Sequence, residues 1–428
     1  MLTERLIFAW CAMRPDNAMH SPNLSVNWSD PWDIAMLTDR RHELTLARLA
    51  RTREFMQAAD IPVLLTLDPN HIFYATGARN MQLFTTRTPT RYLLLFHTGP
   101  SILYEFAGCE HLAAGLPTID LIKPAEGLSF ATSGGTVREA CERLAMEIEA
   151  VIQSVDPHID KIGLDRFPFP ATDALRARGY TLCDADEVLS KARSIKLPIE
   201  IPYMREALRR VDTATHRLEQ ALQPGLTESE AWAEFHYDLM RKEGQYVSTR
   251  LFQSGPRTFP YFQECAARVI ESGDLVCLDT DALGYEGYAV DYSRTFLCGD
   301  SRPTSEQCTL YRLAREQLET NAALLKAGIE YRELAEKAWQ VPEENRKSRY
   351  YCVGHGLGMA GEFPNIPHYE RGTPYPLPGH LETGMVICLE SYVGSETFGQ
   401  GVKLEDQFLI LDTHVERMSQ YPFDLRLS

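Results

Sequence analysis

The chain has 428 residues, which is long for a single hydrophobic core and predicts two domains. Apolar residues make up 44% and charged residues 24%, as in an ordinary globular protein, and the formal net charge of −16 argues against nucleic acid or an anionic membrane as a partner. The ten cysteines form no C-x-x-C pair and several lie in apolar runs, which predicts reduced, buried thiols in a cytoplasmic enzyme.

The first part of the chain alternates strands and helices. An apolar run at residues 6–13 is too short to span a membrane, and we interpret it as a structural segment at a dimer contact. After it, the patterns predict helices over residues 39–59, 136–154 and 170–179 and strands over residues 62–67, 91–97, 101–105 and 162–165. Such alternation is typical of a small α/β domain.

A change of pattern separates this part from the rest of the chain. The composition at residues 190–198 is typical of a connection between domains, and a long helix is expected over residues 200–222. We therefore expect an N-terminal domain at residues 1–192 and a catalytic domain at residues 193–428.

Three aspartates lie in an apolar and aromatic stretch at residues 275–296, L-V-C-L-D-T-D-A-L-G-Y-E-G-Y-A-V-D-Y-S-R-T-F. The pattern predicts a hairpin of strands 275–278 and 289–297, with Gly284 and Gly287 in the turn. Asp279 and Asp281 are two residues apart, so on a strand they share one face. Because unpaired buried carboxylates repel one another, a metal site is favoured over solvated turn aspartates.

Two pairs of similar segments indicate an internal duplication. Residues 271–279 (E-S-G-D-L-V-C-L-D) and 382–390 (E-T-G-M-V-I-C-L-E) share one pattern, each ending in a carboxylate. Residues 222–230 and 325–333 form a second pair, and each is followed by a helical pattern. A duplicated domain has a pseudo-two-fold axis, and we expect Asp279 and Glu390 to meet near it.

Two more candidate ligands occur in the second half of the domain. His355 lies in G-H-G-L-G, where the glycines allow a close approach of the backbone, and Glu405 lies in the strand-like V-K-L-E-D-Q-F-L-I. The resulting oxygen-rich set suits two cations of the Mn, Fe, Co or Zn kind. Its members are Asp279, Asp281, Asp291, His355, Glu390 and Glu405.

This set resembles the dinuclear metal site of the pita-bread family, which includes creatinase, prolidase and methionine aminopeptidase. Within that family the chain is most similar to the dimethylsulfoniopropionate lyases, which share the extra Asp281 that the peptidases lack. The likeness spans nearly the whole chain and is carried by residues 68–84, 249–265, 403–407 and 421–424.

The resemblance implies an α/β (α+β) protein, in which a creatinase/prolidase-type N-terminal domain precedes a pita-bread catalytic domain with pseudo-two-fold symmetry. It also implies two divalent metal ions, with iron expected and manganese, zinc or cobalt as alternatives. Asp291 and Glu405 would bridge them. A homodimer is expected, with Phe84 of one subunit near the site of the other. Phe84 and Tyr350 match the positions where the lyases place aromatic rings for the substrate sulfonium group.

Departures from the family pattern bear on the reaction. The peptidases carry a His before the first aspartate and a His-Glu pair after the ligand His, whereas this chain has no His at residues 259–263 and Gly361-Glu362 at the second place. The lyases have a general-base Asp where this chain has Gly361. The adjacent Glu362, or a hydroxide held by the metals, could act instead, while Glu362 also suits a purely structural role.

Three functions are compatible with these observations. The first is a metal-dependent lyase that removes an α-proton from dimethylsulfoniopropionate, or a similar small cationic carboxylate, and releases dimethyl sulfide and acrylate, with Tyr350 and Glu362 as catalytic candidates. The second is a dinuclear metallohydrolase of the Xaa-Pro peptidase type acting on a dipeptide or small amide. The third, a non-catalytic binding protein, is disfavoured because all six candidate ligands are present.

Overall fold

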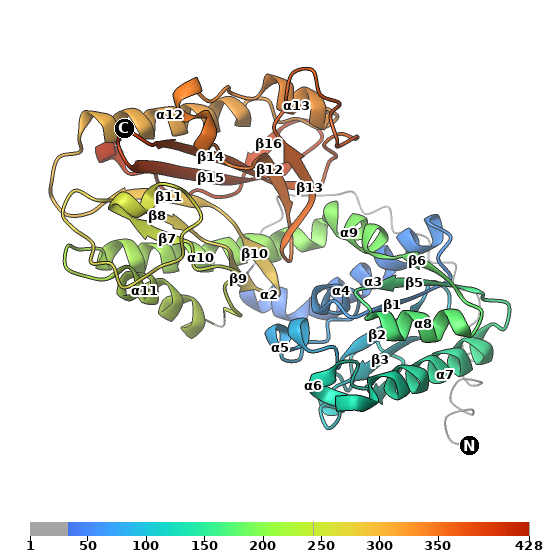
Figure 1. Ribbon diagram of the computed structural model, residues 1–428. Coiled ribbons are helices and arrows are strands. Elements are labelled where there is room, and N and C mark those ends of the chain that lie inside the picture. The colour runs from blue at the N-terminus through green and yellow to red at the C-terminus, as the bar shows by residue number, and fades with distance from the viewer. Residues whose placement is uncertain (1–32, 243, 428) are drawn as a thin grey trace. The chain divides into compact units, whose positions relative to one another are not determined.

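The computed structural model describes residues 33–242 and 244–427 (Figure 1). The chain divides into two units, Met1–Arg193 and Ser194–Ser428. The apolar run at residues 6–13 lies outside the described residues. Among the helices that are described, none is long and apolar enough to cross a membrane.

A six-stranded mixed sheet forms the centre of the first unit, in the order β4-β3-β2-β1-β5-β6. Its strands are β1 (Val63–Thr66), β2 (Tyr92–Phe96), β3 (Ser101–Glu105), β4 (Leu121–Pro124), β5 (Lys161–Asp165) and β6 (Thr181–Asp184). The helices are α2 (Ile34–Asp39), α3 (Arg41–Ala58), α4 (Pro69–Thr76), α5 (Gln82–Arg87), α6 (Phe130–Ser133), α7 (Val137–Val155), α8 (Phe169–Ala177) and α9 (Asp186–Ser194).

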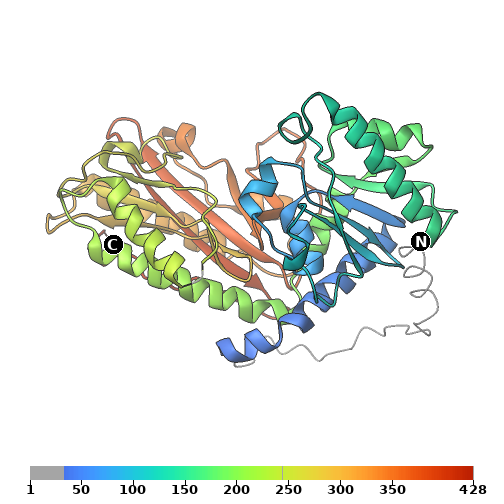
Figure 2. The same ribbon diagram turned by 90° about the horizontal axis from the view of Figure 1, so that it is seen from below.

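Helices cover both faces of this sheet, so its central strands are apolar on both sides. In β1, Val63 and Leu65 pack toward the core under α7 and α8, while Leu64 packs toward the core under α3 and α4. Figure 2 shows α7 and α8 (green) on one side of the sheet and α3 (blue) on the other. This is the predicted α/β organisation, since a strand buried on both faces loses the alternation of apolar and polar residues.

One element of the first unit was not expected from the sequence. The boundary between the two units, after Arg193, falls inside residues 190–198, where the connection between domains was predicted, and helix α9 reaches this boundary by continuing through Ser194. Val188 and Leu189 of this helix pack into the core beside α3, and Asp186 and Glu187 carry negative charge in its first turn, where the helix dipole favours it. Burial of one helical face therefore explains why the chain is helical up to the boundary between the units.

An eight-stranded antiparallel sheet forms the centre of the second unit, with the path β13-β12-β14-β15-β11-β8-β7 and β16 paired with β15. Its strands are β7 (Phe252–Ser254), β8 (Leu275–Asp279), β11 (Ser293–Leu297), β12 (Cys352–Leu357), β13 (Gly361–Pro367), β14 (Val386–Ser395), β15 (Gln400–Ile410) and β16 (Val415–Arg417). A two-stranded sheet pairs β9 (Ala282–Tyr285) with β10 (Tyr288–Val290). The helices are α10 (Ile201–Ala221), α11 (Glu228–Arg241), α12 (Ser305–Ala322) and α13 (Tyr331–Lys337).

The order of the strands displays the predicted duplication. On one side of the junction between β15 and β11 lie β14 and β12, and on the other side lie β8 and β7. The strands that end the two repeated segments, β8 and β14, thus hold equivalent places. Helix α12 packs on β14 and β15, whereas α10 packs on β9 and β10 and α11 on β7 (Figure 1). Each half of the sheet therefore has its own helical cover.

The aspartate hairpin differs from the prediction in its turn. Strand β8 ends at Asp279, and Asp281 has a φ of 36°, so the chain bends there and the expected shared strand face does not exist. The turn lies at Glu286 and Gly287, whose φ values are 47° and 78°. Gly284 instead lies within β9, where a Cβ atom would be 2.6 Å from the carbonyl oxygen of Ala207 on α10. Close helix packing explains that glycine.

Arg294 of β11 connects the central strands to the C-terminal segment at Tyr421 through hydrogen bonds. Its guanidinium is buried and donates to the carbonyl oxygens of Ser293, Glu405 and Tyr421 and, at 2.8 Å, to the carboxylate of Asp406. These bonds hold β11 against β15 at the level of Glu405.

Replacing Arg294 with methionine is therefore expected to lower the free energy of unfolding by about 3–5 kcal/mol, because it leaves the buried Asp406 carboxylate without its main partner. Denaturant unfolding followed by circular dichroism measures the change. Arg332→Met, which removes an exposed pair with Glu336, is the control and should cost less than about 1 kcal/mol. Equal stability of the two variants would contradict the assignment.

Candidate metal centre

The six predicted ligands come from five segments that meet at the middle of the large sheet. Asp279 ends β8, Asp281 and Asp291 flank the β9–β10 hairpin, and His355, Glu390 and Glu405 lie on β12, β14 and β15. The strand register explains the meeting, because Ser293 pairs with Asp279 on one side and with Glu405 on the other, and Glu405 pairs in turn with Glu390.

Side-chain distances place all six in one cluster. Nε2 of His355 lies 3.5 Å from Asp291, 3.3 Å from Glu390 and 3.7 Å from Glu405. One oxygen from each of Asp279, Asp281 and Asp291 falls within 4.8 Å of the others. Asp291 belongs to both groups and joins them. The structure thus brings together the six residues that the sequence singled out. Asp281 reaches the cluster from a bend after β8, and not from the strand face that it was expected to share with Asp279.

Lys403 is a member of the cluster that the sequence analysis did not recognise. Its ammonium group is fully buried and lies 2.5 Å from Glu390, 2.7 Å from Glu405 and 3.6 Å from Asp279. It also donates a 2.8 Å hydrogen bond to Ser293. A signal was available, because Lys403 stands two residues before Glu405 and alternation along a strand puts both on one face.

Two further neighbours orient Asp279. The Ser293 hydroxyl lies 2.8 Å from Asp279 and 2.9 Å from Glu405. The Tyr261 hydroxyl donates to the other oxygen of Asp279. Tyr261 belongs to residues 259–263, the segment in which the peptidases were expected to carry a His, so a phenol in this segment contacts the carboxylate cluster. Its partner was hidden from the sequence because 18 residues separate the two.

The burial of so many acids perturbs their protonation. Burial, reinforced by Asp279, raises the pKa of Asp281 to about 6, and burial with repulsion from Glu405 raises the pKa of Asp291 well above its usual value. Burial also disfavours the charged form of Glu390, but Lys403 outweighs it and lowers the Glu390 pKa. The cluster therefore holds more carboxylates than one ammonium group can neutralise.

Burial and the nearby carboxylate charges also shift the pKa values of His355 and of the neighbouring thiol of Cys388. Burial alone would lower the pKa of His355, but its hydrogen bond to Glu390 and that residue's charge raise the pKa to about 9. Cys388 is close enough to share a metal with Asp291, His355 and Glu405, yet burial and the charge of Asp291 raise its pKa well above the usual value. Its thiol donates to the Asp291 carbonyl oxygen, at 3.5 Å, and so acts as a hydrogen-bond donor.

Of the two predicted substrate-binding aromatics, Tyr350 lies at the cluster. Its ring centroid is 4.7 Å from the Lys403 ammonium and 5.3 Å from the ring centroid of Tyr261. Phe84 lies in the first unit, on α5, where its 44% exposed ring meets Phe106 edge-on. A contact between Phe84 and substrate stays a prediction.

Glu362, the predicted catalytic carboxylate, pairs with Lys196 and with the Met359 N–H. Oε2 of Glu362 lies 3.0 Å from the Lys196 ammonium, with both side chains 1% exposed, and Oε1 accepts a 2.9 Å hydrogen bond from the Met359 N–H. At Gly361, a Cβ atom would lie 3.9 Å from Nδ1 of His355, with no other described atom beyond its chain neighbours within 4 Å. Position 361, which the resemblance implies is the place of the base in the lyases, therefore faces His355 and is open.

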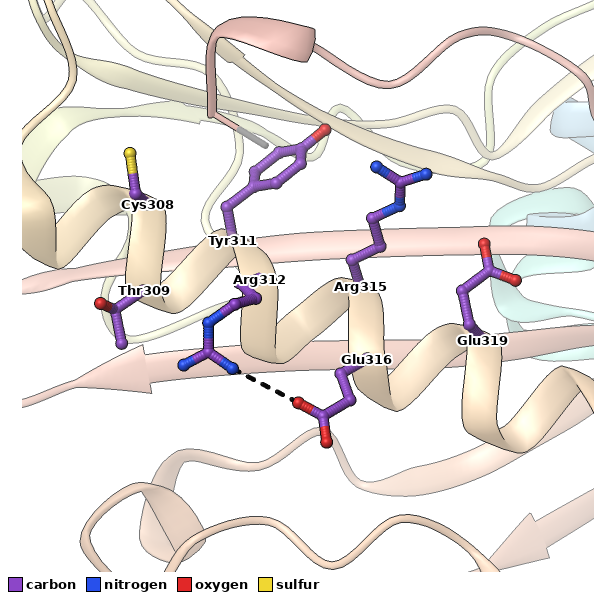
Figure 3. A pocket seen from close by; sticks show the side chains of 7 residues that line it. All are labelled: Cys308, Thr309, Tyr311, Arg312, Arg315, Glu316 and Glu319. Carbon is purple, nitrogen blue, oxygen red and sulfur yellow. Dashed lines mark ion pairs between the residues drawn. The ribbon is translucent and has the colours of Figure 1, made fainter.

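A separate pocket of about 470 Å³ runs along α12 (Figure 3). It is lined by Cys308, Thr309, Tyr311, Arg312, Arg315, Glu316 and Glu319. Arg312 and Glu316 pair across one helical turn at 3.5 Å. None of the six predicted ligands lines it, so it is distinct from the metal centre.

Solved structures with this fold include Xaa-Pro peptidases. The prolidase from Pyrococcus horikoshii OT3 has a TM-score of 0.70 at 22% sequence identity and covers 89% of this chain and 99% of its own. The X-Pro aminopeptidase from Thermotoga maritima MSB8 has a TM-score of 0.70 at 17% identity, covering 88% of this chain and 98% of its own. These likenesses establish the architecture, an N-terminal α/β domain followed by a pita-bread domain.

Sequence relatives add information about chemistry. The dimethylsulfoniopropionate lyase DddP of Roseovarius nubinhibens is 32% identical over 394 residues, which cover 89% of this chain and 88% of that protein. The DddP of Roseobacter denitrificans is 31% identical over 397 residues, covering 92% and 87%. The Xaa-Pro dipeptidase of Lactobacillus delbrueckii subsp. lactis is 27% identical over 228 residues, or 52% of this chain and 59% of that protein.

The model of metallopeptidase family M24 matches residues 202–412. With this match, and with relatives that align over most of its length, the chain belongs to family M24 and is a metal-dependent enzyme.

Proposed function

We propose that the protein is a lyase that cleaves dimethylsulfoniopropionate, or a similar small cationic carboxylate, to dimethyl sulfide and acrylate. The observation that carries the proposal is the aromatic surface beside the carboxylate cluster, where Tyr261 donates to Asp279 and Tyr350 lies within 5.3 Å of Tyr261. Rings in contact with a metal-binding cluster suit a substrate that has a carboxylate at one end and a sulfonium at the other. The similarity to two DddP lyases supports the same substrate.

The residues present fit two divalent cations. Their carboxylate-rich donor set, with a single imidazole, matches the preferences of Mn, Fe, Co and Zn. Oε1 of Glu405 is buried and has no hydrogen-bond partner among the described residues, as expected for an oxygen that takes a cation. The negative charge of five ionised carboxylates would also be neutralised by two divalent cations together with the Lys403 ammonium. We propose iron, with manganese, zinc or cobalt as alternatives.

In this proposal Asp279, Asp281, Asp291, His355, Glu390 and Glu405 would hold the metals. Bound metals would supply Lewis acidity toward the substrate carboxylate and so acidify the α-proton that must leave. Lys403 and Ser293 hold Glu390, Glu405 and Asp279 in place. Burial raises the pKa of Tyr350, so its phenol stays protonated and orients the substrate rather than removing a proton.

The general base is the point at which this chain departs from the lyases. The buried pair of Glu362 with Lys196 supports a structural role for that carboxylate over a base role, because a base must be free to take the α-proton. Gly361 has no side chain to serve. We therefore propose that the cleavage is slow compared with an enzyme that carries a carboxylate at this place.

A second candidate function is hydrolysis of a dipeptide or small amide. It is favoured by relatives such as the Xaa-Pro dipeptidase of Lactobacillus delbrueckii, which aligns with about half of this chain. It is opposed by the absence of a His at residues 259–263 and by the Gly361-Glu362 pair, which leave no imidazole to shuttle a proton there. Identification of the reaction products distinguishes the two functions, because a lyase releases dimethyl sulfide and acrylate whereas a hydrolase releases the two halves of a dipeptide or amide.

We further propose a cytoplasmic homodimer. The cysteines of the described residues are all free thiols, which supports a reducing compartment. Dimerisation is implied by the family resemblance and would place the Phe84 ring of one subunit near the site of the other.

The first test is headspace detection of dimethyl sulfide from metal-loaded protein supplied with dimethylsulfoniopropionate. A signal is expected, and Asp291→Ala should remove both the bound metal and the signal, because Asp291 joins the two ligand groups. Asp300→Ala, at an exposed position on the surface, is the control and should release dimethyl sulfide as the parent does. Absence of dimethyl sulfide despite a full metal complement would refute the lyase, and dipeptides and betaines would then be tried.

The Gly361→Asp variant tests the missing base. A carboxylate there would point toward the space beside His355, so we expect dimethyl sulfide release to rise about 100-fold, a typical contribution of a positioned base. Gly361→Asn has nearly the same shape without a basic oxygen, and it should stay at the level of the parent. An equal rise in both variants would mean that the side chain acts by packing, and no rise in either would sink the base assignment.

The role of Lys403 is tested by stability. In chelator, Lys403→Met should lose about 3–5 kcal/mol of unfolding free energy, because its carboxylate partners become uncompensated. Adding Mn²⁺ should then raise its melting temperature more than it raises that of the parent. Lys196→Met removes another buried lysine–carboxylate pair and should be destabilised without a larger metal response. Similar metal responses in all three proteins would argue against a counter-ion role.

A further inference from the structure

A loop at residues 255–266 carries Tyr261 to the metal centre, and we call these residues the Tyr261 loop. It follows β7, and its regular structure is one 3₁₀ turn, Gly255–Thr258. The Tyr261 hydroxyl donates to Asp279, a proposed metal ligand. A hydroxyl group on a loop stays at one carboxylate only if other contacts fix the backbone of that loop.

One buried carboxylate contacts both ends of the Tyr261 loop. Glu228 lies in the first turn of α11 and is 0% exposed. Its Oε1 accepts hydrogen bonds from the N–H and the hydroxyl of Ser254, the residue before the loop, at 2.8 and 2.7 Å. Its Oε2 accepts from the N–H of Ala266 at 3.1 Å and pairs with Arg257 inside the loop. Both oxygens of Glu228 therefore serve the loop.

Further contacts carry this hold toward the middle of the loop. Arg257, the partner of Glu228, donates with its second terminal nitrogen to the carbonyl oxygen of Glu264 at 2.9 Å. The carbonyl oxygen of Thr258 accepts a 2.7 Å hydrogen bond from the Tyr392 hydroxyl of β14. The backbone is thus fixed on both sides of Tyr261, and the ion pair of Glu228 with Arg257 is part of that support.

The second half of the duplicated domain builds the same turn without a carboxylate. In the two similar segments that precede α11 and α13, Tyr331 stands where the first half has Glu228. The backbone bonds are equivalent, because the Glu228 N–H donates to the carbonyl oxygen of Arg268 at 2.9 Å and the Tyr331 N–H to that of Gly379 at 3.0 Å. The turn itself therefore does not require an acid, and the Glu228 carboxylate serves the loop that only the first half carries to Asp279.

We infer that Glu228 is a positioning residue for the metal centre. By fixing both ends of the Tyr261 loop, it keeps the Tyr261 hydroxyl on Asp279 and so raises the affinity of the centre for metal. This inference rests on the proposed function, which makes Asp279 a ligand. A hydrogen-bond donor orients a ligating carboxylate, and loss of such a partner typically costs about 10- to 100-fold in metal affinity.

Metal affinity of the full-length protein is the direct measure, obtained by titration with Mn²⁺ against a chromophoric chelator. Tyr261→Phe removes only the hydroxyl and should weaken Mn²⁺ binding about tenfold. Glu228→Gln keeps the shape of the side chain, but its NH₂ group cannot accept from the Ala266 N–H or pair with Arg257. It should weaken Mn²⁺ binding by a similar factor.

The double variant distinguishes positioning from a general loss of structure. If Glu228 acts through Tyr261, the combined loss should stay at about tenfold, whereas independent effects would multiply to about a hundredfold. Glu206→Gln is the control, because Glu206 is also 0% exposed but pairs with Arg209 and Arg210 on its own helix. It should lower resistance to denaturant and leave Mn²⁺ affinity unchanged.

A loss of affinity that is equal in Glu206→Gln and Glu228→Gln, or losses that multiply in the double variant, would overturn the inference. Arg257→Gln weakens the same contact from the loop side, at a partly exposed position, and should also lower Mn²⁺ affinity. Unchanged affinity in Arg257→Gln would overturn the inference even if Glu228→Gln does not fold.

The titration involves no turnover, so its result is read in the same way whether or not dimethyl sulfide is released. Undiminished Mn²⁺ binding by Asp279→Ala would remove Asp279 from the ligand set and overturn the inference through its premise. About tenfold losses in both single variants, with no further loss in the double variant, would establish the positioning role.

Discussion

Mutual repulsion of buried carboxylates is the constraint on which the second unit depends. Five acids converge on one place, and their charges can persist there only beside cations or with protons bound. Lys403 supplies one fixed positive charge at 2.5 Å from Glu390 and 2.7 Å from Glu405, while hydroxyl groups satisfy Asp279. The negative charge that Lys403 does not neutralise favours the binding of metal cations, so the repulsion between the carboxylates is also what makes the cluster suitable for metal.

Symmetry makes such a cluster feasible. Each of the two repeats ends in a carboxylate on a buried strand, Asp279 at the end of β8 and Glu390 within β14, and the sheet order places these strands in equivalent positions around β15 and β11. Pairing of Glu405 with both Ser293 and Glu390 then brings the repeats to the same level. Each half has helices on its own strands, with α12 on β14 and β15 and α11 on β7.

Chemistry is decided by the side chains that surround the ligands. The same six residues can serve hydrolysis or elimination, since a dinuclear centre polarises a carboxylate or a carbonyl alike. In this chain the neighbours are rings from residues 261–262 and 350–351, with an open position at Gly361 and Glu362 committed to Lys196. Under the proposed function, these neighbours would receive a cationic substrate and leave the reaction without a carboxylate base at position 361.

The sequence by itself determined the duplicated strand pattern, the six residues that meet in the cluster and the α/β character of the first unit, because these are carried by local periodicity and residue type. Tertiary structure alone decided the rest. Helix α9 continues to the boundary between the units because one of its faces is buried, and Gly284 was explained by contact with α10 rather than by a turn. The contacts of Asp279 with Lys403 and Tyr261, and of Glu362 with Lys196, join residues that lie far apart along the chain. No local pattern states which such side chains a fold will bring within hydrogen-bonding distance.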